Sequence, residues 1–323
     1  MCIRDRTYLN NYQKNQPMPD AETEWQLDSM LIKMLNVDAV NAFAKQTILP
    51  TNQVIVINAP EKEGVATPTA EEILAIRDKV AASEVTAYED NVVKEPLIAE
   101  GTVLKGSPVK KTVEDKQLGT TEWTLANGAK VVVKPTTFKA DEVRLGVVGK
   151  GGLSLLSDEE YYMGEMMPAV NSMSGVGKFS ATELKKQLSG KTASVQPSVE
   201  NYTSAMGGVC SPKDIETMLQ LLYLNFTQPR FNKDDVDNLT KMLLAQLANA
   251  KSNPDFLMQE KVADVTYGHN PRRQMISTEI VNKFDFEQLP GIYAKLYPGA
   301  NGFVFTFVAV SYTHLTLPTI CSV

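Results

Sequence analysis

Four acidic residues within one short stretch are the first candidates for chemistry: Asp158, Glu159, Glu160 and Glu165. Closely spaced carboxylates can act together as a general acid and a general base. The same residues suit a structural role, because acids in the first turn of a helix stabilise its positive N-terminal end. We favour this structural role and keep an unrelated hydrolase that uses the cluster as a third functional hypothesis.

Residues that bind soft metals are few. Between residues 7 and 309 the chain has one cysteine, Cys210, and one histidine, His269. A single thiol can neither form an internal disulfide nor build a metal cluster, and Cys210 is predicted to be a small buried strand residue. His269 stands in a Gly-His-Asn-Pro turn and is predicted to lie near solvent. Four methionines are expected to fill the core, since no thiolates accompany them: Met163, Met166, Met167 and Met173.

Nucleotide and nucleic-acid binding are disfavoured by the sequence. The glycines at 146, 149, 151 and 152 form neither a G-x-G-x-x-G motif nor a P-loop before a helix. The formal net charge of −6 argues against the basic face that nucleic acid requires, and Arg272-Arg273 is predicted to be an isolated surface pair. No apolar run approaches the roughly 20 residues of a membrane span. The 43% apolar and 22% charged content is ordinary for a globular protein.

The two ends of the chain share one DNA sequence read in opposite directions. Met-Cys-Ile-Arg-Asp at residues 1–5 can be encoded by ATGTGTATAAGAGAC. The reverse complement of that string encodes Val-Ser-Tyr-Thr-His, which is residues 310–314. This pattern is typical of a transposon-end adapter in a sequencing library, such as a metagenomic one. We therefore expect residues 1–6 and 310–323 to be adapter-derived and the chain to be a fragment.

Residues 7–82 are predicted to be the tail of an α/β domain. Thr69 and Glu72 form a capping box that begins a helix. Periodicity is lost over residues 83–119, and two prolines within that stretch favour an extended interdomain linker. The other elements predicted before the linker are helices at 20–35 and 37–46 and a strand at 53–58.

Residues 120–309 are predicted to form a second, truncated domain. Asn127-Gly128 between two apolar runs is the strongest short hairpin signal. Ser180 with Glu183 forms another capping box, and Ser211-Pro212 begins a helix with proline at its first position. The predicted strands are 122–126, 130–134, 141–148, 192–199, 202–210 and 302–308, and the longer helices are 159–172, 212–226, 234–251 and 286–297. This order predicts an α+β fold, a mixed and largely antiparallel sheet covered by helices.

Five segments resemble the insulinase/pitrilysin-type zinc metallopeptidases, or inverzincins, and especially the long bacterial PqqL-like members. They are residues 123–135 (WTLANGAKVVVKP), 150–155 (KGGLSL), 177–190 (GKFSATELKKQLSG), 214–230 (DIETMLQLLYLNFTQPR) and 303–308 (FVFTFV). The resemblance implies a peptidase-like domain at 120–309, preceded by the tail of a homologous domain. Such proteins are similar to a clamshell of two halves that encloses unstructured peptides, and only the first half carries zinc.

The resemblance also implies where the zinc site of the family would fall. The family motif H-x-x-E-H, with two histidine ligands and a glutamate that activates water, aligns with residues 162–166. There Tyr162 and Met166 replace both histidines, and Glu165 keeps the acid. A phenol has a pKa near ~10, and a thioether does not replace an imidazole for Zn²⁺. The family's third ligand, a glutamate, has no counterpart in residues 241–250 (KMLLAQLANA).

We therefore predict no catalytic residue, no cofactor and no metal in this chain, and zinc only in a catalytic domain outside it. The first hypothesis is a non-catalytic portion of a zinc metalloendopeptidase, inactive alone. The alternative is a non-enzymatic structural or binding subunit homologous to the peptidase. The expected partners are peptide substrate and the missing N-terminal catalytic half, with no nucleic acid and no membrane span. The resemblance implies a periplasmic location.

Overall fold

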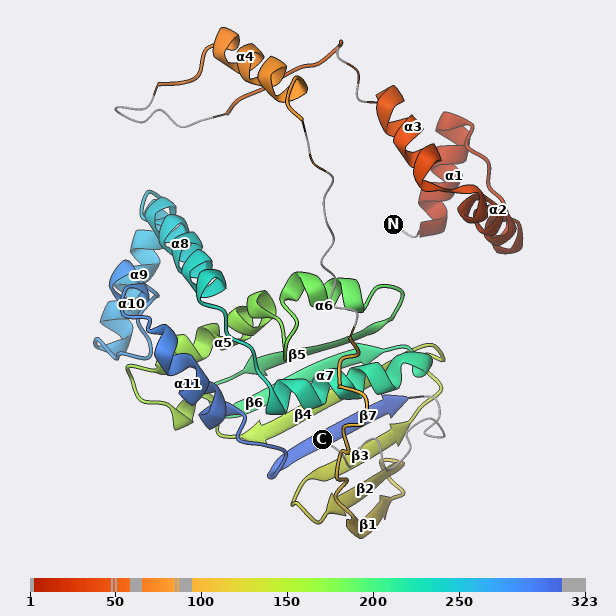
Figure 1. Ribbon diagram of the computed structural model, residues 1–323. Helices are drawn as coiled ribbons and strands as arrows, with labels where there is room; N and C mark the ends of the chain where they lie inside the picture. Colours follow the sequence, from red (N-terminus) through yellow and green to blue (C-terminus); the bar gives the residue numbers. More distant parts are fainter. Residues whose placement is uncertain are drawn as a thin grey trace. The chain divides into compact units, whose positions relative to one another are not determined.

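The computed structural model describes residues 3–47, 49, 51–58, 66–84, 86 and 95–309. The chain divides into two compact units, Met1–Ala87 and Tyr88–Val323. Each unit is described by itself below (Figure 1).

The first unit is helical in its described part. Its helices are α1 (Ile3–Lys14), α2 (Ala21–Met34), α3 (Val37–Thr47) and α4 (Ala70–Ala81). The Asp20 side chain accepts a hydrogen bond from the backbone N–H of Thr23 and begins α2. The predicted capping box of Thr69 and Glu72 is confirmed at the start of α4.

The first unit exposes most of its apolar side chains. No residue of α2, α3 or α4 is buried, and Trp25 is 68% exposed. The predicted strand at 53–58 is wrong, because these residues pair with no strand in the described chain and Val54 is 87% exposed. A β-branched run supplies strand propensity, but a strand forms only when a partner satisfies its backbone groups.

The second unit contains one seven-stranded sheet within the residues that the structure describes. Its strands are β1 (Val109–Asp115), β2 (Thr120–Leu125), β3 (Lys130–Pro135), β4 (Val143–Lys150), β5 (Ala193–Val199), β6 (Thr203–Cys210) and β7 (Phe303–Ala309). The spatial order is β1-β2-β3-β7-β4-β6-β5, with β3 and β7 parallel and the other neighbours antiparallel. The predicted α+β fold with a mixed, largely antiparallel sheet is confirmed.

The last strand of the chain lies in the middle of this sheet. β7 pairs with β3 on one side and with β4 on the other. Its alternate residues Phe303, Phe305 and Phe307 are buried. Because β7 joins the hairpin β2–β3 to the group β4–β6–β5, the sheet is continuous only when this distant segment is in place (Figure 1).

The hairpin signal is confirmed between β2 and β3. Gly128 adopts a φ of +88°, and the side-chain oxygen of Asn127 accepts a hydrogen bond from the N–H of Ala129. Glycine reaches a positive φ without the strain that a Cβ would add. The pair therefore fixes the register of the two strands.

The predicted linker at 83–119 is wrong at its C-terminal end. Residues 109–115 form β1, which pairs antiparallel with β2 at the edge of the sheet. Every residue of β1 is exposed, so the strand carries no hydrophobic alternation that sequence reasoning could detect. Its stability comes from backbone pairing with β2, a long-range contact.

Helices cover one face of the sheet. The described helical segments are η1 (Gly152–Leu155), α5 (Tyr161–Ser174), α6 (Ala181–Gln187), η2 (Pro212–Asp214), α7 (Ile215–Thr227), α8 (Lys233–Ala250), α9 (Pro254–Tyr267), α10 (Thr278–Val281), η3 (Phe286–Gln288) and α11 (Leu289–Leu296). Figure 1 shows α7 lying over the strands, with α5 and α11 nearby. Met218 and Leu222 of α7, Ile292 of α11 and Phe307 of β7 are fully buried in the shared core.

Candidate functional site

The N-terminal half of α5 holds the residues that align with the zinc motif. Tyr162 is 7% exposed, and its hydroxyl donates a hydrogen bond to the backbone oxygen of Gln274 at 2.6 Å. Burial, together with the charge of Glu165, raises the pKa of Tyr162. The phenol therefore stays protonated and is used as a hydrogen-bond donor to the fold.

Glu165 and Met166 offer little to a metal. Glu165 is exposed and has no hydrogen bond or ion pair to any described residue, and partial desolvation of its carboxyl raises its pKa. Met166 is half-buried. No group of three histidine, cysteine, aspartate or glutamate residues that could hold a metal occurs in the described chain. The alignment of residues 162–166 with the family motif stays a prediction.

Three acids of the cluster, Asp158, Glu159 and Glu160, lie just before α5, not in its first turn as predicted, because α5 begins at Tyr161; the fourth, Glu165, lies within the helix. Glu160 forms an ion pair with Lys295 of α11 at 2.6 Å, and this partner lowers the pKa of the Glu160 carboxyl. Asp158 forms an ion pair with Arg272 at 2.5 Å. These two acids therefore attach α5 to later parts of the chain.

The prediction that Arg272-Arg273 is only a surface pair agrees with the exposure of Arg273 and is wrong for Arg272. Besides Asp158, its guanidinium donates hydrogen bonds to the backbone oxygens of Leu153 and Leu156, at 3.3 Å and 2.7 Å. It also lies 5.4 Å from the ring centroid of Tyr161. A guanidinium suits this role because its donors form a planar fork that several oxygens can share. No local pattern in the sequence indicates that these distant carbonyls converge.

The remaining candidates lie where the sequence predicts them. Cys210 is buried, and burial raises the pKa of its thiol to about 12, so the thiol is inert. The side chain of His269 is 78% exposed and its Nδ1 contacts a carboxylate oxygen of Asp264. Met163 and Met167 are buried in the core, while Met173 is partly buried against it.

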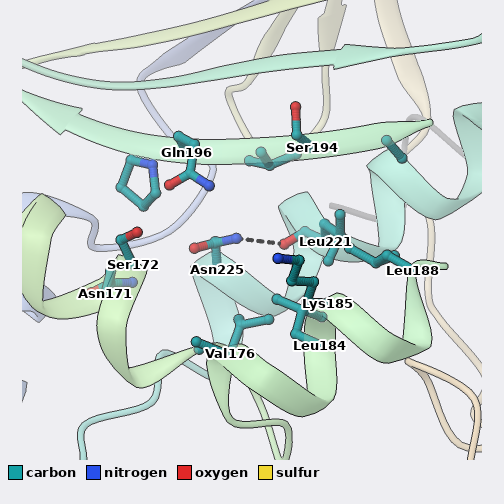
Figure 2. Close-up of a pocket in the computed structure, with 15 residues that line it drawn as sticks. Asn171, Ser172, Val176, Leu184, Lys185, Leu188, Ser194, Gln196, Leu221 and Asn225 are labelled. Carbon is teal, nitrogen blue, oxygen red and sulfur yellow. Dashed lines mark hydrogen bonds between the residues drawn. The ribbon is translucent and has the colours of Figure 1, made fainter. Parts of the chain in front are cut away.

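A cavity of about 370 Å³ opens at the C-terminal half of α5. It is bordered by α5, α6, α7 and the strand β5, which pairs only with β6 among the described strands (Figure 2). Apolar side chains form much of its wall: Val176, Leu184, Leu188, Val195, Pro197 and Leu221. Its polar side chains are Asn171, Ser172, Lys185, Ser194, Gln196 and Asn225, and no aspartate or glutamate borders it.

Asn171 is the unusual residue of this cavity. It is 5% exposed, and neither its side-chain nitrogen nor its side-chain oxygen has a hydrogen-bond partner. The side chain of Asn171 lies beside the hydroxyl of Tyr293 and lowers its pKa, against the larger rise from burial, while that hydroxyl donates to the backbone oxygen of Asn225. A buried amide without partners costs about 1–3 kcal/mol.

Sequence reasoning missed this cavity. The sequence offers one signal, because each of two helices has an asparagine after an apolar stretch. Asn171 follows Pro-Ala-Val in α5, and Asn225 follows Leu-Tyr-Leu in α7. Asn225 has an internal explanation, because its side-chain nitrogen donates to the backbone oxygen of Leu221 at 2.8 Å. Asn171 has none.

A second cavity, of about 380 Å³, lies beside Tyr162. It is bordered by the acidic residues before α5 and by residues near α10 and η3. Two of its polar groups, the hydroxyl of Tyr162 and the carboxylate of Asp158, already have partners. It therefore presents fewer unused groups than the cavity at Asn171.

No protein-family model matches the chain. The chain is 22% identical over 275 residues to a PQQL-like zinc protease of Arabidopsis thaliana, a match that covers 83% of this chain and 25% of that protein. It is 25% identical over 103 residues to a probable zinc protease PqqL of Haemophilus influenzae, covering 32% and 11% of the two chains. The chain thus spans about a quarter of the length of the first relative and less of the second.

Solved structures share the fold. The periplasmic protease PqqL of Escherichia coli matches with a TM-score of 0.61 and 18% identity, over 100% of this chain and 36% of that one. The ferredoxin protease FusC, in complex with Arabidopsis ferredoxin, matches with a TM-score of 0.63 and 14% identity, over 99% and 35%. An inactive peptidase M16 domain of Pseudomonas fluorescens matches with a TM-score of 0.52 and 18% identity, over 64% and 50%.

These identities to solved structures establish the fold alone, and the two sequence relatives are both named as zinc proteases. Among the described helices, none combines the length and the apolar character that a membrane crossing requires. With zinc-protease relatives in sequence and peptidase neighbours in structure, the chain is similar to peptidases of the insulinase type.

Proposed function

We propose that the chain is a non-catalytic portion of a zinc metalloendopeptidase, which encloses and helps bind unstructured peptides for hydrolysis by a zinc domain outside this chain. The observation that supports the proposal is what the α5 side chains do at the positions that we align with the family's zinc motif. Tyr162 donates its hydroxyl to a backbone carbonyl, and Glu165 stands without an imidazole beside it. Tyr162 thus serves packing and hydrogen bonding within the fold.

The domain assignment is part of the same proposal. Residues 120–309 would be the inactive peptidase-like domain, to which β1 adds an edge strand, and residues 7–82 the tail of a preceding homologous domain. The exposed apolar side chains of α2 and α3 support this, because a helix with an apolar face needs a partner to cover it. The partners would be peptide substrate and a catalytic half, and the relative named as periplasmic supports a periplasmic location.

The first test measures bound zinc and cleavage by the purified chain. Elemental analysis should give no stoichiometric zinc, and an unstructured fluorogenic peptide should stay intact, while the same peptide binds in a fluorescence polarisation assay. One equivalent of zinc with chelator-sensitive cleavage would overturn the proposal. Absence of both cleavage and peptide binding would instead favour the alternative, a structural subunit.

A further inference from the structure

We infer that the uncovered face of the seven-stranded sheet docks an amphipathic helix supplied from outside the described chain, with small and aliphatic residues toward the sheet and acidic residues along its flanks. This inference goes beyond the proposed function, because it concerns a partner on the sheet and neither zinc nor peptide cleavage. The described helices of the second unit cover the opposite face (Figure 1). The uncovered face is formed by the alternate residues of each strand that point away from the core.

Part of this face is apolar where a face in water would be polar. The outward residues of the edge strand β5 are Ser194, Gln196 and Ser198, as expected for contact with water. Those of the three neighbouring strands β7, β4 and β6 are mostly aliphatic, and Val148 and Val209 are 46% and 36% exposed. We call these aliphatic residues and the two glycines among them the outer strip: Val148, Ala205, Val209, Val304, Val308, Gly146 and Gly207.

The two glycines of the outer strip are open on the side away from the core. Gly146 and Gly207 are direct cross-strand partners, and no described atom lies within 4 Å of the place that a Cβ would take at either. On the core face, by contrast, a Cβ at Gly149 would lie 2.5 Å from the ring of Phe303. Glycine inside a strand costs roughly 0.5–1 kcal/mol relative to alanine. Close approach of another backbone would account for this cost at Gly146 and Gly207.

The dimensions of the outer strip match one helix. Because β4 lies between β7 and β6, the strip is two strand spacings wide, about 10 Å. A helix with its side chains has a diameter of about 10–12 Å. From Val304 to Val308 the strip is about 13 Å long, the length of roughly nine helical residues. A helix also pairs its own backbone groups, whereas an extended segment laid on the face of a sheet would leave its N–H and C=O groups unpaired.

The charges around the outer strip favour a helix with acidic flanks. Among the outward residues of β3, β7, β4, β6 and β5, none is acidic and four are basic: Lys130, Lys134, Arg144 and Lys150. Glu122 and Glu142 pair with Lys130 and Arg144, at 3.0 Å and 2.6 Å, while Lys134 and Lys150 form no ion pair with a described residue. A second copy of the chain would bring the same positive charges, so two copies stacked on this face would repel each other.

The first test uses two fluorescein-labelled, stapled helical peptides of about 15 residues. Both carry one stripe of alanine and leucine, and the flanks carry glutamate in one peptide and lysine in the other. Fluorescence polarisation on the whole chain should show the glutamate peptide binding at least about tenfold tighter. Non-specific attraction would favour the lysine peptide, because the net charge of the chain is −6. Absence of glutamate-peptide binding, or equal affinity for both peptides, would overturn the inference.

A charge reversal tests the flanks. The double variant Lys134→Glu with Lys150→Glu should bind the lysine peptide more tightly than the glutamate peptide, because the two unpaired positive charges beside the outer strip become negative. An unchanged order of affinities would contradict the acidic flanks that we assign to the partner.

Gly146→Val tests the place of closest approach. It should weaken binding of the glutamate peptide at least about tenfold, because the isopropyl group occupies the space that the helix would enter. The melting temperature should stay equal or rise, because valine favours strands and meets no described atom there. Thr112→Val is the matched control, since Thr112 lies on the exposed strand β1 outside the outer strip. It should change neither binding nor melting temperature.

Gly207→Val repeats this test on the neighbouring strand, in case Gly146→Val folds poorly. Loss of binding in either variant at an unchanged melting temperature would support the docking surface. Unchanged binding in a stable variant would overturn it. A large fall in melting temperature for both variants would show that the fold itself requires the two glycines, and this result would also overturn the inference. The proposed function would stand in each case, because it depends on the zinc and cleavage measurements.

Discussion

The two halves of α5 use their polar residues in opposite ways. At the N-terminal half, Tyr162 donates to a backbone carbonyl and the acids before the helix pair with Lys295 and Arg272. At the C-terminal half, Asn171 is buried with both amide atoms unpaired beside a cavity. Polar groups that the fold satisfies position its elements, whereas a polar group that it leaves buried and unpaired costs stability. In the half that we align with the family's catalytic motif, the fold therefore uses Tyr162 and the acids before the helix as structural contacts.

The largest expected effect at the structural half comes from Arg272→Ala. The substitution removes an ion pair, two hydrogen bonds to backbone oxygens and the contact with the Tyr161 ring. We expect a loss of about 2–3 kcal/mol in the free energy of unfolding, measured by urea denaturation. Arg273→Ala changes the neighbouring exposed residue and should cost within about 0.5 kcal/mol. Equal losses for the two variants would contradict the assigned role of Arg272.

A smaller effect is expected for Tyr162→Phe. The variant keeps the ring in the core and removes the hydroxyl that donates to the backbone oxygen of Gln274. Loss of one such hydrogen bond should reduce the free energy of unfolding by about 1 kcal/mol. Tyr202→Phe, at a tyrosine that is 75% exposed, serves as the control and should have no measurable effect. If the wild-type chain bound zinc and Tyr162→Phe lost it, or if the variant changed peptide binding, the aligned motif would have a ligand role after all.

The smallest expected effects on stability depend on pH and have opposite signs for two acidic residues, Glu160 and Glu165. The pKa of Glu160 is lowered by Lys295, so its contribution is present above the unfolded pKa near ~4.3 and is lost as pH falls below it. Glu160→Gln should therefore lower the free energy of unfolding at pH 7 by about 1 kcal/mol or less. The difference from wild type, followed by the melting temperature at each pH, should shrink toward pH 3.

Glu165→Gln should have the opposite effect on stability at pH 7. The pKa of Glu165 is raised by desolvation, so its charged form opposes folding above the folded pKa, and this penalty is relieved as pH falls. The variant should be slightly more stable than wild type at pH 7 and equal to it near pH 4. Unchanged peptide binding is also expected, and a loss of any detected hydrolytic activity would revive the hypothesis of an acidic-cluster hydrolase.

Local signals in the sequence were enough for many elements. The capping boxes at Thr69 and Ser180 and the turn at Asn127-Gly128 act through hydrogen bonds within a few residues, so the sequence determines them without tertiary context. Helical spacing located α7 and α8 for the same reason, and alternation located β4 and β6. The core role of Met163 and Met167 also followed from their helix.

Only the tertiary structure decided what depends on distant partners. The exposed run at 109–115 became the strand β1 because β2 pairs with it, whereas the β-branched run at 53–58 did not become a strand because no described strand pairs with it. The central place of β7 and the role of Arg272 likewise required long-range contacts. The cavity at Asn171 arises where four separate elements meet. Sequence patterns report local backbone preferences and burial, whereas pairing partners and cavities are properties of how distant segments pack together.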